Sequence, residues 1–164
     1  GRQHIMDAGY FSRIEAMHFV LSHDDGQMIR DLDQADVVLL GVSRTSKTPT
    51  SIYLANRGIK TANIPIVPGC ALPEEVFTAS NPLVVGLTKE PKRLVEIRRQ
   101  RLKLLDQNEG SDYVDLEKVS EEINEARRLF TKNNWPVINV SHKSIEETAA
   151  TIIQLYNRRR EEED

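Results

Sequence analysis

Four short apolar runs alternate with helical segments from residue 37 onward, and this alternation constrains the fold more than any other feature. The runs "ADVVLLG", "TANIPIVPG", "NPLVVGLT" and "WPVINVS" are short and rich in aliphatic or β-branched residues, as is typical of buried strands. Amphipathic stretches such as 90–106 and 115–130 separate them. Alternating strands and helices predict an α/β fold with a largely parallel sheet flanked by helices. The prolines of the second run place it toward an edge.

The chain divides into three predicted segments. Residues 1–36 are expected to form an N-terminal helix from about Asp7, an extended stretch over 18–27 and a turn at "HDDG", packed on the core. Residues 37–157 form the predicted α/β domain, and residues 158–164, "RRREEED", form a flexible tail. Because the chain starts at Gly1 without a methionine, we expect a piece of a longer protein.

Composition excludes several classes of function. The 164 residues carry a net charge of −3, which gives no reason to expect nucleic acid or an anionic membrane as partner. Cys70 is the single cysteine, so the chain cannot form an internal disulfide. No apolar run approaches the roughly 20 residues of a membrane helix. A cytoplasmic protein is therefore expected, and several amphipathic helices leave room for a homodimer.

The stretch "GVSRTSKTPTS" follows the first apolar run and resembles a phosphate-binding loop. That pattern has glycine, four residues, then glycine, lysine and a hydroxyl residue, and Ser46 stands where the second glycine is usual. A buried strand before the loop and a helix after it are the context that the pattern requires. The predicted nucleotide-binding residues are Gly41, Val42, Ser43, Arg44, Thr45, Ser46, Lys47 and Thr48. The alternative interpretation is a Ser/Thr-rich turn with an exposed lysine.

Phosphate chemistry requires three things of this loop. Backbone N–H groups converge on phosphate oxygens at the positive end of a helix. An ammonium, here Lys47, reaches the outer phosphates, and a hydroxyl, here Thr48, binds magnesium. If the loop needs a positive φ at Ser46, serine costs about 1 kcal/mol relative to glycine.

Two adjacent carboxylates, Asp24 and Asp25, are the candidate acids. No apolar run ends in the aspartate that usually accompanies a phosphate loop, and "LTKEP" has Glu90 where a guanine-reading motif needs aspartate, so a GTPase is not expected. Paired carboxylates beside a glycine turn can bind a metal or accept a hydroxyl proton. The alternative is a plain Asp-Gly turn. The helix predicted from Pro91 carries basic residues that indicate a solvated face or, alternatively, a docking face for a protein substrate: Lys92, Arg93, Arg98, Arg99, Arg101 and Lys103.

Seven segments resemble one protein family and occur in the same order as in that family. They are "GRQH", "HDDG", "GVSRTSKTPTSIYLANRG", "IPIVPG", "GLT", "RLVEIR" and "SIEETAATI", and they span nearly the whole chain. The family comprises the bifunctional kinase–phosphorylase regulators of pyruvate, phosphate dikinase and of phosphoenolpyruvate synthase. Its members commonly have glycine at the position of Ser46, and they are longer at the amino end.

The resemblance implies an activity and a fold. Such proteins have a P-loop kinase-like domain, which identifies residues 37–157 as the expected nucleotide-binding kinase domain. They phosphorylate a threonine of the dikinase or synthase with ADP as donor, leaving AMP. The target is recognised when its neighbouring catalytic histidine is phosphorylated. They reverse the modification with inorganic phosphate and release pyrophosphate. The nucleotide-binding stretch of the family falls on residues 41–48. The residues "SRTSKTPTSIYLANRG" favour the dikinase as the target.

These observations combine into a mechanistic hypothesis. The loop amides, Lys47 and Arg44 hold the ADP phosphates, and Thr48 with Asp24 holds magnesium. Asp25 or Asp24 accepts the proton of the target threonine and returns it in the reverse direction. Two other functions remain open: a small-metabolite kinase with the same loop, and a non-catalytic nucleotide-binding module whose partner supplies the chemistry.

Overall fold

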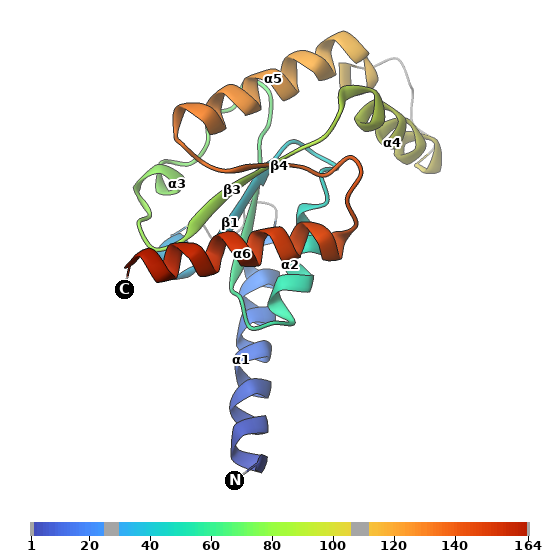
Figure 1. Ribbon diagram of the computed structural model, residues 1–164. Coiled ribbons are helices and arrows are strands. Elements are labelled where there is room, and N and C mark those ends of the chain that lie inside the picture. The colour runs from blue at the N-terminus through green and yellow to red at the C-terminus, as the bar shows by residue number, and fades with distance from the viewer. Residues whose placement is uncertain (1, 25–29, 106–111, 164) are drawn as a thin grey trace.

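The computed structural model describes residues 2–24, 30–105 and 112–163, and Figure 1 shows its arrangement. In these residues one sheet of four parallel strands has the order β2-β1-β3-β4. The strands are β1 (Val37–Gly41), β2 (Thr61–Pro65), β3 (Leu83–Thr88) and β4 (Val137–Asn139). The α-helices are α1 (Arg2–Ser22), α2 (Lys47–Ala55), α3 (Glu74–Thr78), α4 (Pro91–Leu104), α5 (Leu116–Lys132) and α6 (Ile145–Glu163), and short 3-10 turns cover Leu32–Gln34 and Asp112–Val114. The predicted α/β fold and the edge position of β2 are confirmed.

Helices cover both faces of the sheet because successive side chains of its buried strands point to opposite sides. Val38 and Leu40 of β1 belong to the apolar cluster that α4 and α5 complete with Leu94 and Phe130. Val37 and Leu39 belong instead to the cluster formed with α2 and α6. Residue 86 must be glycine at the first face, because a Cβ there would lie 2.4 Å from the Phe130 ring.

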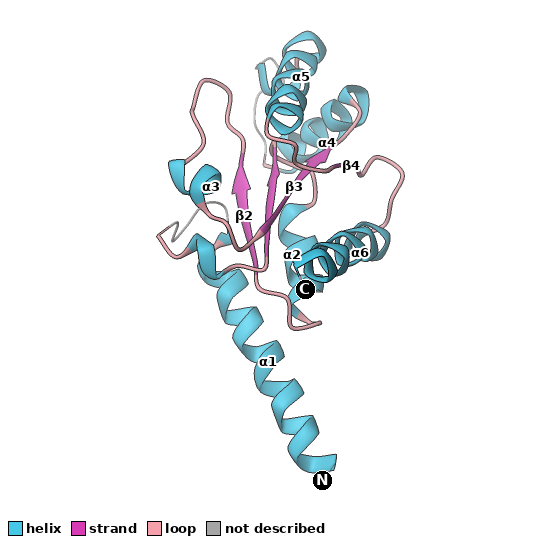
Figure 2. Ribbon diagram, turned by 60° about the vertical axis from the view of Figure 1, so that its left-hand side comes forward, coloured by secondary structure: helices cyan, strands magenta, loops and turns pink. Residues whose placement is uncertain are grey.

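The strands all end on the same side of the molecule. In Figure 2 the arrowheads of the strands point toward α4 and α5, while α1 projects from the opposite end. The register pairs Leu40 with both Ile64 and Gly86, so the segments after β1, β2 and β3 emerge next to one another. In sheets of this kind ligands bind outside the carboxyl ends of the strands.

Helix α1 departs from the sequence prediction at its carboxyl end. Residues 18–22 were expected to be extended, but α1 continues to Ser22. The reason is tertiary packing: Ala16 and Val20 are buried against Ala55 of α2, which requires helical spacing. Nearer the amino end two aromatic side chains of α1 are open to solvent, with Tyr10 54% and Phe11 66% exposed.

The carboxyl-terminal helix also extends further than predicted. A capping box begins α6, where Ser144 Oγ accepts a hydrogen bond from Glu147 N at 3.1 Å. The segment from residue 158, predicted to be a flexible tail, remains helical through Glu163. Arg159 holds it by donating to the carbonyls of Ser80 and Asn81, both at 2.7 Å. Across the described ranges, no helix has the length and apolar character needed to cross a bilayer.

Candidate phosphate-binding site

The loop predicted to bind phosphate lies between β1 and α2, at the carboxyl edge of the sheet. Ser46 immediately precedes α2 and has φ 66° and ψ 28°, in the left-handed region where glycine is unstrained. Arg44 also has a positive φ, of 70°. Two left-handed residues within three positions curl the main chain back toward the start of the helix. This geometry explains why glycine is usual at position 46 and what the serine there must tolerate.

Lys47 turns inward over the loop rather than out into solvent. Its side chain is only 6% exposed, and Nζ donates to the carbonyl of Val42 at 3.0 Å. Thr45 Oγ1 donates to the same carbonyl at 2.8 Å. The Val42 carbonyl therefore connects the first part of the loop with Thr45 and Lys47 near its end. The exposed lysine of the alternative interpretation is therefore excluded. The first N–H groups of α2 have no acceptor within the helix and present its positive end at this position.

Gly41 is required by close contacts at the end of β1. A Cβ at this residue would lie 2.6 Å from Thr45 Oγ1 and 3.0 Å from the main-chain oxygen of Leu87. The first distance is shorter than real Cβ contacts allow, and the second is tighter than most of them. Glycine therefore lets the loop lie this close to the end of β1 without a shift of Thr45.

Residues 23 and 24, which follow α1 and are called the acid segment below, contact the loop at Thr48. Thr48 Oγ1 donates to Asp24 Oδ1 at 2.8 Å, and Asn63 Nδ2 donates to the same carboxylate oxygen. The main-chain N–H of Asn63 also donates to the carbonyl of His23 at 3.1 Å, which fixes the end of α1 on β2. Asp24 and Thr48, predicted to act together, are thus adjacent. Asp25, the other predicted acid, lies outside the described residues.

The buried ring of His23 holds the acid segment in place through contacts with Phe19 and Asp31. The ring is 3% exposed, stacks on Phe19 with centroids 3.7 Å apart, and places Nε2 2.6 Å from Asp31 Oδ1. Nδ1 lies 2.8 Å from the carbonyl of Phe19. Both ring nitrogens are occupied, so His23 positions its neighbour Asp24 and is not open to a ligand.

A cavity of about 380 Å³ opens beside the loop. Three cationic side chains from different segments line it, Arg44, Lys47 and Lys89, and no carboxylate occurs among its described lining residues. Burial, together with the nearby positive charge of Arg93, lowers the pKa of Lys89 below its ordinary value. The remaining lining residues are Ser43, Ser46, Thr48, Pro49, Pro65, Ile97 and Tyr113. A half-open cavity lined by three cations beside the start of a helix suits a compact polyanion.

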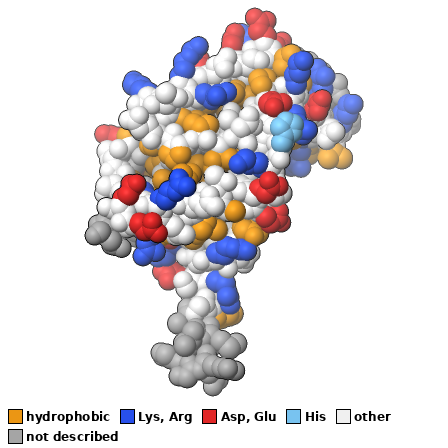
Figure 3. Space-filling model, in the orientation of Figure 1, with side chains coloured by type: hydrophobic (Ala, Val, Ile, Leu, Met, Phe, Trp, Pro, Cys, Tyr) orange, Lys and Arg blue, Asp and Glu red, His pale blue; other side chains and the backbone are white. Residues whose placement is uncertain are grey.

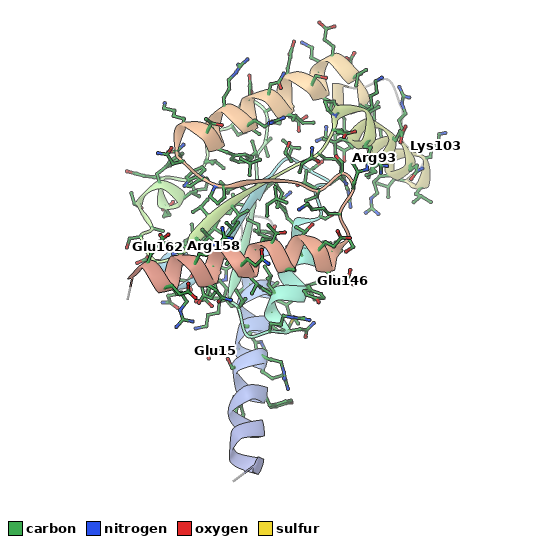
Figure 4. The ribbon with its side chains drawn as sticks, viewed as in Figure 1. Glu15, Arg93, Lys103, Glu146, Arg158 and Glu162 are labelled. Atoms are coloured by element: carbon green, nitrogen blue, oxygen red, sulfur yellow. The ribbon has the colours of Figure 1, made fainter. Side chains whose placement is uncertain are left out.

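Arg98 supports the loop from behind, which corrects one sequence interpretation. It was grouped with the residues of a solvated or docking face of α4, yet it is 1% exposed and forms a two-pronged pair with Glu122 at 3.0 and 2.8 Å. Its Nη2 also donates to the carbonyl of Ser43 at 3.3 Å. The α4 prediction erred because the helix packs against α5 on that side. By contrast, Figures 3 and 4 show basic side chains on the outside of α4, with Arg93 and Lys103 labelled at its rim.

Tyr113 connects the loop to Arg98 and to a second cavity. Ser43 Oγ donates to its hydroxyl at 3.2 Å, and the Arg98 guanidinium lies 4.5 Å from the centre of its ring. The second cavity, of about 470 Å³, shares Ser43, Pro65 and Tyr113 with the first and continues along α5. The two cavities therefore adjoin.

Sequence reasoning missed Lys89, Asn63 and Tyr113. Lys89 directly follows the third predicted strand, and the rule that ligands bind at the carboxyl ends of parallel strands could have identified it. Asn63 lies within a strand, where its amide carries no pattern. Tyr113 reaches the loop only through the packing of α4 against α5, which no local signal encodes.

A metal ion at this site would be held by the Thr48 hydroxyl and the Asp24 carboxylate. Within the part of the chain that is described, no group of three or more His, Cys, Asp or Glu side chains gathers as a metal centre. A hydroxyl and a carboxylate oxygen 2.8 Å apart are hard oxygen donors, and magnesium bound to nucleotides takes one or two protein oxygens plus phosphate and water. The residues present fit magnesium.

The fold and this site define the chain as an α/β domain of the P-loop kinase-like class. The chain belongs to the kinase/pyrophosphorylase family, which matches it over residues 1–153. A relative from Paramagnetospirillum magneticum is 63% identical over 96% of this chain and 51% of its own length. Relatives from Sinorhizobium medicae and Erythrobacter litoralis are 59% and 56% identical, over 98% and 97% of the chain and 59% and 57% of their own lengths. All three carry the name "Putative pyruvate, phosphate dikinase regulatory protein". The chain spans between half and three-fifths of these relatives' lengths.

Proposed function

We propose that this chain is the nucleotide-binding and catalytic part of a regulator of pyruvate, phosphate dikinase, working as an ADP-dependent protein kinase and a phosphate-dependent phosphorylase. The observation that carries the proposal is the contact between Thr48 and Asp24, which brings the acid segment to the start of the phosphate loop helix. The relatives' names favour the dikinase over phosphoenolpyruvate synthase as the target. The expected cytoplasmic location stays a prediction.

In the forward direction the cavity holds the diphosphate of ADP. The loop amides, Lys47 and Arg44 neutralise its charge, and Thr48 with Asp24 holds magnesium, which would supply further charge neutralisation on the phosphate oxygens. The threonine hydroxyl of the target attacks the β-phosphorus, the bond from that phosphorus to the bridging oxygen breaks, and AMP leaves. The hydroxyl proton passes to a carboxylate.

In the reverse direction inorganic phosphate takes the place of the AMP phosphate. Its oxygen attacks the phosphorus of the phosphothreonine, the bond to the threonine oxygen breaks, and pyrophosphate forms. The same carboxylic acid returns its proton to the threonine oxygen, as microscopic reversibility requires. Pyrophosphate and ADP share a diphosphate, so one cavity serves both directions.

Asp25 is the better candidate for the base. Oδ1 of Asp24 already accepts from Thr48 and Asn63, an arrangement that suits a positioning and metal-holding role. Asp25 carries the second carboxylate of the "HDDG" segment, and its role stays a prediction.

The decisive assay supplies ADP, magnesium and dikinase phosphorylated on its catalytic histidine, and detects phosphothreonine. A second arm supplies phosphothreonyl dikinase with inorganic phosphate and measures pyrophosphate. Asp25→Ala is expected to abolish both directions, since the proton acceptor is lost, while ADP still binds. Glu146→Gln removes an exposed carboxylate on α6 and serves as the control.

Each other outcome separates the alternatives. Retained turnover in Asp25→Ala would remove that residue from the role of base. Phosphorylation of a nucleoside monophosphate in place of the dikinase would point to a small-metabolite kinase. ADP binding with no transfer by the wild-type chain would leave a nucleotide-binding module.

A further inference from the structure

Lys89 reaches the phosphate cavity from a different element than the loop does. It directly follows β3, whose neighbour β1 leads into the loop, and the two strand ends lie so close that a Cβ on Gly41 would be 3.0 Å from the main-chain oxygen of Leu87. The main chain on either side is fixed, because Val140 N donates to the carbonyl of Thr88 at 2.8 Å and Glu90 N donates to Ser141 Oγ at 2.8 Å. Lys89 is therefore held in place at the wall of the cavity formed by the end of β3.

Among the residues that the structure describes, the ammonium of Lys89 has no partner that neutralises it. The side chain is 9% exposed and lines the cavity, and within the described ranges it makes neither a hydrogen bond nor an ion pair. Arg93 on α4 acts on it with a charge of the same sign, and the other two charged residues in the described lining of the cavity, Arg44 and Lys47, are also cations. A buried ammonium among like charges is costly unless an anion completes it.

Lys47 and Lys89 together mark two places for negative charge. Lys47 is held to the loop by its hydrogen bond to the Val42 carbonyl. Its charge would therefore lie beside the phosphate that the loop amides bind. Lys89 approaches from the end of β3 and is not tied to the loop. Two cations on separate elements match a ligand with two linked anionic groups better than one with a single group.

We propose that Lys89 binds the second phosphate of a diphosphate whose first phosphate is enclosed by residues 42–48. The ligand class is a P–O–P diphosphate, either free pyrophosphate or the diphosphate of a nucleotide. The assignment deepens the proposed function and rests on it for the role of the diphosphate. Its test needs neither the target protein nor any transfer step.

The test compares three probes on the 164-residue chain by calorimetry: pyrophosphate, ADP and orthophosphate. Lys89→Met is expected to weaken pyrophosphate binding about tenfold or more, since a charge-assisted contact is lost, while orthophosphate held by the loop changes less than about twofold. Loss with both pyrophosphate and ADP assigns Lys89 to the shared diphosphate, and loss with pyrophosphate alone restricts the site to the free anion. Lys89→Arg keeps the charge and is expected to stay within about threefold of wild type.

Lys92→Met is the matched control because it removes the same charge from an exposed position of α4 three residues away. Equal pyrophosphate affinity in wild type and Lys89→Met would overturn the proposal, as would an equal loss in Lys92→Met or an equal loss of orthophosphate. Melting curves verify folding, and Lys89→Gln replaces Lys89→Met if the latter is unfolded. A wild-type chain that binds pyrophosphate through Lys89 yet never modifies the dikinase would refute the proposed function and leave this inference intact.

Discussion

Two residues with left-handed backbone, Arg44 and Ser46, shape the phosphate loop. Neither is glycine, so the chain holds strain of about 1 kcal/mol at each residue. The sequence identified position 46 as the departure from the usual loop pattern, and the observed φ of 66° is the positive value that the pattern implies. Nothing in the sequence indicated the positive φ at Arg44.

Replacing Ser46 by glycine tests this strain directly. Ser46→Gly is expected to raise the free energy of unfolding by about 0.5–1 kcal/mol, because the relief of left-handed strain exceeds the added entropy of the unfolded chain. Urea denaturation measures the change. Ser120→Gly, in the middle of α5, is the matched control and should lower stability by about 0.5 kcal/mol. A loss of stability in both variants would contradict the strain argument.

Gly41 provides the opposite test, because its site has no room for a side chain. Gly41→Ala is expected to lower the free energy of unfolding by about 1–3 kcal/mol, since the new Cβ meets Thr45 Oγ1 and the Leu87 carbonyl. The displaced loop should also bind ADP about tenfold more weakly. Gly9→Ala lies on α1 in open space and should be neutral or stabilising, so equal losses in the two variants would exclude a steric cause.

At the scale of elements, the pairing of α4 with α5 positions the loop. Arg98→Met removes a buried guanidinium and leaves Glu122, which is 11% exposed, without its partner. We expect a loss of about 3–5 kcal/mol in the free energy of unfolding, and recovery of most of it in Arg98→Met/Glu122→Leu. Arg99→Met, exposed on the same helix, should change stability by less than about 0.5 kcal/mol. An equal free energy of unfolding for Arg98→Met and Arg99→Met would show that the Arg98–Glu122 pair does not stabilise the fold.

The sequence predicted the strands better than the helix faces. Buried parallel strands appear as short aliphatic runs whichever face their side chains take, so β1 and β3 were identified from composition alone. The amphipathic pattern of residues 90–106 does not show which of its apolar residues are buried: Leu94 is 0% exposed and Leu104 is 81% exposed. The end of α1 was missed because "HFVLS" has strand-like residues that become helical only through contact with α2. Side-chain identity does not encode such long-range contacts.

At the scale of the whole molecule, the candidate site gathers residues from at least five separated segments of the chain: Asp24, the loop of residues 41–48, Asn63, Lys89 and Tyr113. The sequence correctly placed the loop, Lys47 and Thr48 in one strand–loop–helix unit, because adjacent residues in a known pattern need no tertiary information. It could propose Asp24 as their neighbour but not derive the contact, since residues 24 and 48 meet only through the docking of α1 on β2.

Magnesium binding can be followed through the stability of the whole chain, because a ligand that binds only the folded chain raises its melting temperature. With ADP at about 100 times its dissociation constant, stabilisation is about 2.7 kcal/mol, or several degrees for a chain of this size. We expect magnesium to add to the ADP shift in wild type and to add nothing in Asp24→Asn, measured by calorimetric scans. Glu96→Gln, exposed on α4, should behave as wild type. An unchanged magnesium increment in Asp24→Asn would remove this residue from the metal site.

The carboxylate of Asp24 is held at once by a side chain of β2 and by one at the start of α2. A chain whose first helix has come away would therefore keep its phosphate loop and yet lose the acid beside it. Under the proposed function, such a molecule would still bind a nucleotide but could not transfer its phosphate, so that binding and transfer would be lost separately.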